Sequence, residues 1–170
     1  MEKPTLICMV GLSGSGKSTK AKELAETENY KIVSTDEIRK QYCRGIWDQS
    51  KNHTVFQIFY SKIKYALQNG ENVIADATFL TKKERCFILK VVQDIPCVTK
   101  AYVMNKPFDQ CIADNFDRDF SVPVSAMVKQ KKKFTIPTVE EGFSSVIIEN
   151  CYKEKGKETE NTNEEEIDFC

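Results

Sequence analysis

The sequence has no long hydrophobic run, no closely spaced pair of cysteines, and only one histidine and one tryptophan. No apolar stretch reaches the ~20 residues that a membrane-spanning helix needs, and the apolar start of the chain is too short for the core of a signal peptide. The seven cysteines are an odd number without a Cys-x-x-Cys pair, which argues against a disulfide framework or a zinc site. We therefore expect a protein of a reducing cytoplasm, without a membrane partner.

An excess of charge of either sign is also absent, since 25 basic and 25 acidic side chains give a formal net charge of zero. Residues 151–170 hold three of the basic and seven of the acidic side chains, which leaves 22 and 18 in residues 1–150. This division predicts one folded domain over residues 1–150 and a disordered acidic tail over residues 151–170. The mildly basic domain permits a phosphate-rich partner but does not require one.

Short apolar segments alternate with helical patterns along the first 150 residues. Strands are expected at 5–10, 31–34, 71–79, 97–105 and 144–149. Helices are expected at 17–28, 36–42, 53–70, 81–94, 106–116 and 122–134. This alternation predicts an α/β fold with a central, mostly parallel sheet of four to five strands and helices on both faces. Ligands of such sheets bind at the carboxyl ends of the strands, so the residues after each strand are candidate site residues.

The segment GLSGSGKS after the first expected strand matches the phosphate-binding pattern G-x-x-x-x-G-K-[ST] in full. Its glycines allow consecutive backbone N–H groups to surround a phosphate, and the following helix adds its positive N-terminal end. The pattern assigns Lys17 to the β- and γ-phosphates and the Ser18 hydroxyl to Mg²⁺. The sequence therefore predicts a three-layer P-loop NTPase fold and a nucleotide site. Its expected members are Gly11, Leu12, Ser13, Gly14, Ser15, Gly16, Lys17, Ser18 and Thr19.

Two further strand ends carry polar side chains that suit phosphoryl transfer. Asp36 follows the second expected strand, and Arg39 lies one helical turn later on the same side of the helix. Asp76 ends the third expected strand, two residues before Thr78. An aspartate within hydrogen-bonding reach of an alcohol can accept its proton as the alcohol attacks a phosphate. We therefore expect these side chains to meet the phosphate loop at one edge of the sheet.

Some of these features have a second, purely structural interpretation. Ser34 and Glu37 have the spacing of a capping box, so the segment around Asp36 also suits a plain helix start. A group of lysines near residue 130 suits either a nucleic-acid groove or a solvated helix face. Trp47 suits either stacking on a base or ordinary packing at the surface. The lysines of that group are Lys129, Lys131, Lys132 and Lys133.

Four segments, GLSGSGKST, STDEIR, VIADATF and VPVSAMVKQKKKFTIPTVEEGFSSVI, resemble the P-loop kinase domain of polynucleotide 5′-hydroxyl kinases. They are especially similar to the kinase part of polynucleotide kinase-phosphatases, over about residues 5–149. The resemblance implies ATP as donor, Mg²⁺ as cofactor, a helical lid, and the 5′-hydroxyl end of RNA or DNA as acceptor. Since relatives are often fused to phosphatase or ligase modules, it also implies an association with separate activities of these kinds.

The resemblance assigns roles to individual residues. It makes Asp36 the general base, Arg39 a contact of the substrate phosphate, and Asp76 a contact of the acceptor nucleoside. Arg118, which precedes the Val-Pro pair at 122–123, corresponds to a lid arginine that clamps the donor phosphates. Many relatives begin this lid segment with an Arg-Asn pair, where this chain has Asp114 and Asn115.

The sequence therefore predicts a kinase that transfers the γ-phosphate of ATP to a polynucleotide 5′-hydroxyl. Its expected catalytic residues are Asp36, Lys17 and Arg118, with Arg39, Asp76 and Thr78 at the acceptor. One alternative keeps the reaction but makes the acceptor a small alcohol, such as a nucleoside, a sugar or an antibiotic. The other is a nucleotide-dependent binding protein that phosphorylates no acceptor.

Overall fold

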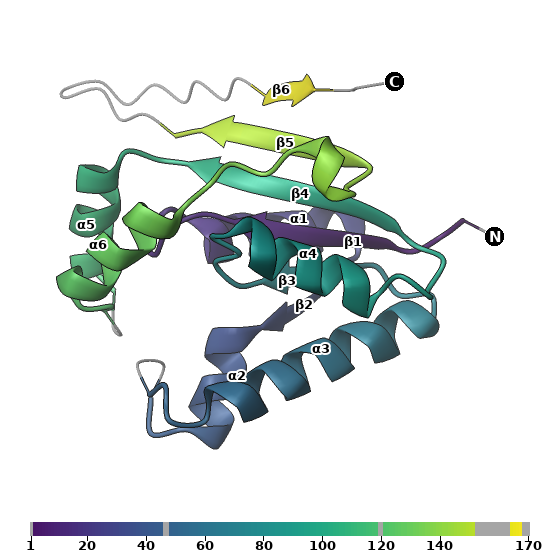
Figure 1. The fold of residues 1–170 in the computed structure, drawn as a ribbon, viewed down its shortest axis with the longest axis horizontal. Coiled ribbons are helices and arrows are strands. Elements are labelled where there is room, and N and C mark those ends of the chain that lie inside the picture. Colours follow the sequence, from purple (N-terminus) through teal and green to yellow (C-terminus); the bar gives the residue numbers. More distant parts are fainter. Residues whose placement is uncertain (1, 46–47, 119–120, 152–163, 168–170) are drawn as a thin grey trace.

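A six-stranded sheet forms the centre of the molecule (Figure 1). The computed structural model describes residues 2–45, 48–118, 121–151 and 164–167 of the 170-residue chain. The strand order is β2-β3-β1-β4-β5-β6; the first five strands are parallel to one another, and β6 is antiparallel to β5. The strands are β1 (Thr5–Val10), β2 (Lys31–Ser34), β3 (Val73–Asp76), β4 (Val98–Asn105), β5 (Ser145–Asn150) and β6 (Glu164–Ile167).

Helices connect the parallel strands, as the alternating pattern predicts. Each expected helix is present, with ends that differ from the expected ones by a few residues. A short 3₁₀ helix, η1 (Val139–Glu141), precedes β5. The α-helices are α1 (Lys17–Glu28), α2 (Thr35–Tyr42), α3 (Asn52–Gln68), α4 (Lys82–Val91), α5 (Phe108–Phe116) and α6 (Val124–Lys133). The structure thus confirms the α/β fold of the P-loop NTPase type.

Alternate residues of β1 pack on opposite faces of the sheet. Leu6 and Cys8 pack with Phe59 of α3 in the larger core cluster, which also includes residues of α4. Ile7 packs with Ala21 of α1 in a second cluster on the other face. A strand covered on both faces is apolar at every position, which explains the continuous hydrophobic run of β1. The sheet is therefore a fixed platform for whatever follows the carboxyl ends of its strands.

The chain places successive strands on both sides of β1. β3 is its neighbour on one side and β4 its neighbour on the other. Because the connections from the two sides of β1 run in opposite directions, a crevice forms at the carboxyl end of this strand, where ligands of α/β sheets bind. The glycine-rich segment that follows β1 lies at this point, so the topology brings the loops after β1, β2, β3 and β4 together.

The described part of the acidic tail contains a strand, where the composition predicted no regular structure. In β6, Ile167 lies opposite Val146 of β5 and Glu164 lies opposite Glu149. Without β6, β5 would be an edge strand with unpaired backbone N–H and C=O groups. The charged composition of this segment does not indicate that its backbone pairs with the edge of the sheet. The rest of the expected tail, 152–163 and 168–170, lies outside the described residues.

The six cysteines of the described segments are free thiols. Cys8 and Cys111 are buried, and burial raises the pKa of the Cys8 thiol to about 12. Such thiols pack as small apolar side chains, in agreement with the absence of a disulfide pattern. No helix within the described residues is long and apolar enough to cross a membrane.

Candidate active site

The glycine-rich segment forms a loop between β1 and α1 that only glycine fits at two positions. Gly14 has a φ of 79°, and a Cβ atom there would lie 2.2 Å from the carbonyl oxygen of Cys111 in α5. Gly16 has a φ of 93° at the start of α1, and no side chain caps this helix. The first N–H groups of α1 therefore point out of the helix end without a side-chain partner, as an anion site requires.

Lys17, the first residue of α1, lies over this loop. Its Nζ donates a hydrogen bond to the carbonyl oxygen of Leu12 at 2.8 Å, and its side chain is buried. Burial lowers the pKa of the Lys17 ammonium, against the opposing effect of Asp76 and Asp36. An ammonium group has three N–H donors, so two remain for a ligand. Lys17 thus holds a desolvated positive charge beside the loop, as binding of a phosphate requires.

Ser18 and Asp76 form a hydroxyl–carboxylate pair next to Lys17. The Ser18 hydroxyl donates to Oδ2 of Asp76 at 2.8 Å, and Asp76 is only 7% exposed. Burial raises the pKa of the Asp76 carboxyl, while Lys17 and the hydrogen bond from Ser18 lower it. Both groups offer the hard oxygen ligands that Mg²⁺ prefers, and Mg²⁺ sites typically use only one or two protein ligands beside phosphate and water. The pair therefore fits a magnesium ion.

Asp36 lies in the first turn of α2 and is 44% exposed, in contrast to Asp76. The start of the helix is capped by Ser34, whose hydroxyl accepts from the N–H of Glu37 at 3.4 Å. The Glu37 carboxylate pairs with Lys40 on the surface of α2. The serine half of the expected capping box is thus confirmed. Because Ser34 is the cap, the carboxylate of Asp36 is left for another role.

Arg118 is the charged partner of Asp36. Its Nη2 lies 3.8 Å from Oδ2 of Asp36, and the side chain is 37% exposed. It follows the end of α5, so this ion pair joins the α5–α6 segment to α2. At 3.8 Å and this exposure the pair is long and solvated, and such pairs contribute little to stability. Both groups are therefore positioned near one another yet accessible to a ligand.

Arg39 has contacts that the sequence did not predict. It is 6% exposed, and its Nη1 donates to the carbonyl oxygen of Asp48 at 3.1 Å. Its Nη2 donates to the side chain of Asn52 at the start of α3. The guanidinium therefore holds the loop between α2 and α3 while it also lines the cleft. Trp47, for which stacking was one interpretation, belongs to this loop but lies outside the described residues.

Two amide side chains whose contacts the sequence did not predict organise the lid formed by α5 and α6. Gln130 of α6 makes two hydrogen bonds to Ser13: its Oε1 accepts from the backbone N–H at 3.0 Å, and its Nε2 donates to the hydroxyl at 2.9 Å. Asn115 is fully buried and makes two hydrogen bonds to the backbone of Val122, at 3.0 and 2.7 Å. The lid is thereby held against the phosphate loop.

The residue pair at the start of the lid segment, where this chain differs from many kinases, also has defined contacts. Asp114 pairs with Lys106, whose Nζ also donates to the carbonyl oxygen of Gly14 at 3.0 Å. Asp114 is thus connected to the phosphate loop through Lys106, whereas the hydrogen bonds of Asn115 stay within the lid. The departure from an Arg-Asn pair is thus accompanied by a second connection between these two segments.

Arg85 of α4 is a third residue that the sequence did not single out. It is completely buried and forms a two-pronged ion pair with Glu141, at 2.8 and 2.9 Å. Its remaining donors bond to carbonyl oxygens of Phe79 and Thr135 and to the Thr135 hydroxyl. A buried guanidinium is stable only when its donors are satisfied in this way. Arg85 therefore fixes the chain between α6 and η1, and Glu141 has a structural role.

A cleft of about 760 Å³ lies between the phosphate loop, α2, the end of β3 and the lid. Of the residues expected at the site, all line it except Gly11, Leu12 and Ser15, which stand behind its wall. Gly11 donates to the Thr78 carbonyl at 3.1 Å, which joins the loop to the end of β3. Six cationic and four acidic side chains line the cleft: Lys17, Arg39, Lys106, Arg118, Lys129 and Lys133, with Asp36, Asp76, Glu84 and Asp114.

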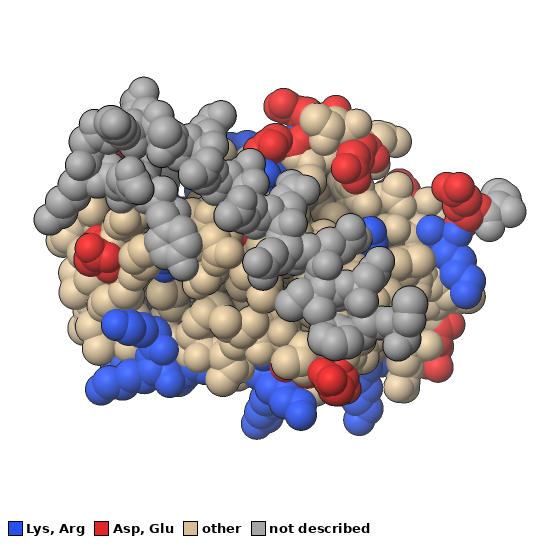
Figure 2. Space-filling view, turned by 90° about the horizontal axis from the view of Figure 1, so that it is seen from above, with Lys and Arg blue, Asp and Glu red and all other residues tan. Residues whose placement is uncertain are grey.

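This excess of positive charge suits a phosphate ligand. Lys and Arg side chains also gather along the lower margin of the face shown in Figure 2, in agreement with the mildly basic composition of residues 1–150.

Solved structures with the same fold include a chain in the Pnkp1/Rnl/Hen1 RNA repair complex, with a TM-score of 0.69 and 23% identity. That match covers 78% of this chain and 44% of the other, so this chain spans less than half of its length. A putative kinase from Chloroflexus aurantiacus matches with a TM-score of 0.66 and 16% identity, over 88% of this chain and 89% of that one.

A gluconokinase from Sinorhizobium meliloti matches with a TM-score of 0.61 and 15% identity, over 91% of this chain and 86% of that one. At these identities the similarities show a common fold. No curated protein matches the chain. The model of one protein family, described as AAA domain, matches residues 6–137. The protein therefore belongs to the AAA domain family and has the P-loop kinase fold.

Proposed function

We propose that the protein is an ATP-dependent kinase that phosphorylates the 5′-hydroxyl of a polynucleotide, either RNA or DNA. The observation that carries this proposal is the position of Asp36. Its carboxylate is half exposed, has no capping role, and lines the same cleft as Lys17 and the Ser18–Asp76 pair. A nucleotide-binding protein without an acceptor would have no use for an accessible carboxylate there, whereas a kinase needs a proton acceptor.

In the proposed reaction the acceptor hydroxyl oxygen attacks the γ-phosphorus of ATP, and its proton passes to a carboxylate oxygen of Asp36. The bond from the γ-phosphorus to the bridging oxygen breaks, and ADP leaves. Lys17 and the first N–H groups of α1 would bind the β- and γ-phosphates, and Arg118 would reach them from the lid. Ser18 and Asp76 would hold Mg²⁺, which when bound neutralises charge on the phosphates.

The acceptor side supports a phosphate-bearing substrate. Lys129 and Lys133 lie one helical turn apart on the cleft wall, and within the described part of the chain no salt bridge involves either of them. Arg39 and Thr78 would contact the acceptor where α2 and β3 meet the cleft, and Asp76 would be shared between the acceptor and Mg²⁺. The similarity in fold to a chain of an RNA repair complex supports the same choice. It also supports an association with separate repair activities, such as a phosphatase or a ligase.

A small-molecule kinase is the second candidate. The fold matches a solved sugar kinase and a gluconokinase over 86% of the length of each, which is a more complete match than the 44% of the RNA repair chain. Such an enzyme would transfer phosphate to a sugar, nucleoside or antibiotic hydroxyl by the same chemistry. It has no use for Lys129 and Lys133 on the cleft wall of the lid, which is why we place it second.

One assay separates these functions. The protein is incubated with γ-labelled ATP and Mg²⁺ over 5′-hydroxyl RNA, 5′-hydroxyl DNA, and a panel of nucleosides and sugars. We expect label on a polynucleotide 5′ end, and a loss of about 100- to 10,000-fold in rate for Asp36→Ala, with ATP binding retained. Asp94→Ala is the matched control, because Asp94 is exposed and lies outside the cleft.

Other outcomes would contradict the proposal in distinct ways. Label on a sugar or nucleoside alone would establish the second candidate. Label in free phosphate alone would indicate a nucleotide-dependent binding protein. Equal turnover by Asp36→Ala and Asp94→Ala would remove Asp36 from its role as the base.

A further inference from the structure

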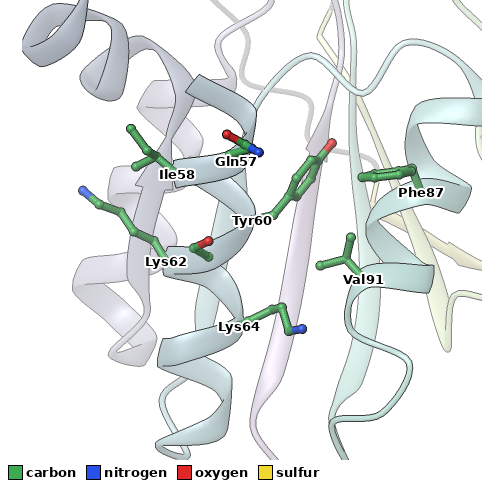
Figure 3. Close-up of a pocket in the computed structure, with 8 residues that line it drawn as sticks. Gln57, Ile58, Tyr60, Lys62, Lys64, Phe87 and Val91 are labelled. Carbon is green, nitrogen blue, oxygen red and sulfur yellow. The ribbon is translucent and has the colours of Figure 1, made fainter. Parts of the chain in front are cut away.

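A second hollow lies outside the active-site cleft, between α3 and α4 (Figure 3). This α3–α4 groove has a volume of about 650 Å³. Tyr60 and Lys64 lie on the side of α3 that faces α4, and Phe87 and Val91 project towards them from α4. An aromatic pair, an aliphatic side chain and a lysine therefore line one shallow surface. Nothing in the proposed phosphoryl transfer uses it.

The groove is continuous with the acceptor end of the cleft through aromatic rings. Phe56 lines the cleft, one helical turn before Tyr60 on α3, and the two ring centres are 5.8 Å apart. The Tyr60 and Phe87 ring centres are 5.1 Å apart across the groove, with the rings inclined at 53°. Three rings thus follow one another from the cleft to the outer surface. The last of them, Phe87, is 51% exposed, so its ring is accessible to a ligand.

The charge of the surrounding helices differs from that of the whole chain, whose formal net charge is zero. α3 contains Lys62 and Lys64 and no acidic residue, and both lysines line the groove. The exposed side chains of α4 add three lysines against the single carboxylate of Glu84. Among the described residues that line the groove, none is acidic. A polyanion is therefore the complementary partner of this surface.

We propose that the α3–α4 groove binds the acceptor strand beyond its 5′-terminal nucleotide, as a track for single-stranded polynucleotide. This inference rests on the proposed function and names where the rest of the substrate lies. Unpaired bases stack on aromatic rings while lysines neutralise the backbone, and this combination is typical of single-strand sites. The terminal hydroxyl lies at Asp36, and the following bases pass Phe56 and stack on Tyr60 and Phe87. A duplex keeps its bases inside and gains nothing from these rings.

The proposal predicts that Phe87 matters only for substrates long enough to reach it. The test compares kcat/KM for a nucleoside 3′-monophosphate and for a single strand of about ten nucleotides, with the full chain. Phe87→Ala should reduce kcat/KM for the long strand by about 5- to 150-fold, the usual effect of removing one stacking platform. The monophosphate ends before the groove and should keep its wild-type value. Tyr65→Ala is the control, since Tyr65 is exposed on α3 and lies outside the groove.

A second variant tests the charge. Lys64→Gln should weaken binding of the long strand. The slope of log KM against log salt concentration should also fall by about 0.7, the value for one phosphate contact in a single strand. An equal loss of activity on both substrates by Phe87→Ala would indicate a packing role and would overturn the proposal. So would an unchanged value for the long strand, or a change in oligomeric state with either variant. If the wild-type protein phosphorylates neither substrate, the proposed function itself fails.

Discussion

The two walls of the cleft hold their charged groups in different ways. On the phosphate-loop wall, Lys17 and Asp76 are buried, and each has a hydrogen bond at 2.8 Å. On the opposite wall, Asp36 and Arg118 are between a third and a half exposed and face each other at 3.8 Å. The first wall is fixed by the fold before any ligand arrives, whereas the second leaves its groups accessible. A donor phosphate needs the first arrangement, and an exchanging acceptor hydroxyl needs the second.

The largest effect is expected on the fixed wall. Lys17→Met removes the buried ammonium and keeps a side chain of similar length, so transfer should fall by about 100- to 1,000-fold and ATP binding should weaken. The fold should not suffer, because burial lowers the pKa of Lys17 and the folded protein therefore disfavours its charge. Turnover and nucleotide binding are measured beside Lys22→Met, a change on the exposed side of the same helix.

Unchanged ATP binding by Lys17→Met would contradict the assignment of the phosphate-loop wall to the donor. If Lys17→Met bound ATP as tightly as Lys22→Met, the fixed wall would not be the donor site. The acceptor would then have to be sought at the phosphate loop, and Asp36 would lose its role.

Removing the contact between the two walls should reduce activity less than Lys17→Met does. Gln130 joins the lid to the phosphate loop by two hydrogen bonds to Ser13, each worth about 1 kcal/mol. Gln130→Ala should therefore reduce kcat/KM for ATP by up to about thirtyfold through a less firmly closed lid. Ser13→Ala removes only one of these bonds and should cost less. If the bonds act together, the double variant should be no worse than Gln130→Ala alone, whereas additive losses would mean that the two residues act separately.

The same contrast explains how much of the site the sequence could predict. Alternating strands and helices, together with the glycine-rich motif, were enough to place Lys17, Asp36 and Asp76 at one sheet edge. The motif places Lys17, and the order of strands and helices places Asp36 and Asp76. Both can be predicted from local sequence patterns. Their positions in the cleft agree with that expectation.

Contacts between distant side chains carry no such signal. Gln130 and Ser13 are 117 residues apart, and Arg85 pairs with a glutamate 56 residues away. Periodicity reports which face of a helix is buried but not which polar groups meet there, so a buried arginine looks the same as a solvated one. The rings of Phe56, Tyr60 and Phe87 read as ordinary apolar positions until α3 and α4 are placed side by side.

The smallest predicted effect concerns stability, and it separates the two aspartates. Burial raises the pKa of Asp76 above its value in the unfolded chain, so the folded state binds the proton more tightly. The ionised carboxylate therefore costs stability, and this cost appears as the pH rises through its titration range. Asp76→Asn keeps an acceptor for the Ser18 hydroxyl and should raise the Tm of the ligand-free protein at neutral pH. The gain should vanish below the pKa of an ordinary carboxyl, where Asp76 is protonated in both states. Asp36→Asn changes a half-exposed group in a long, solvated ion pair and should change the Tm little at neutral pH; an equal gain from both variants would show that burial is not the source of the gain for Asp76.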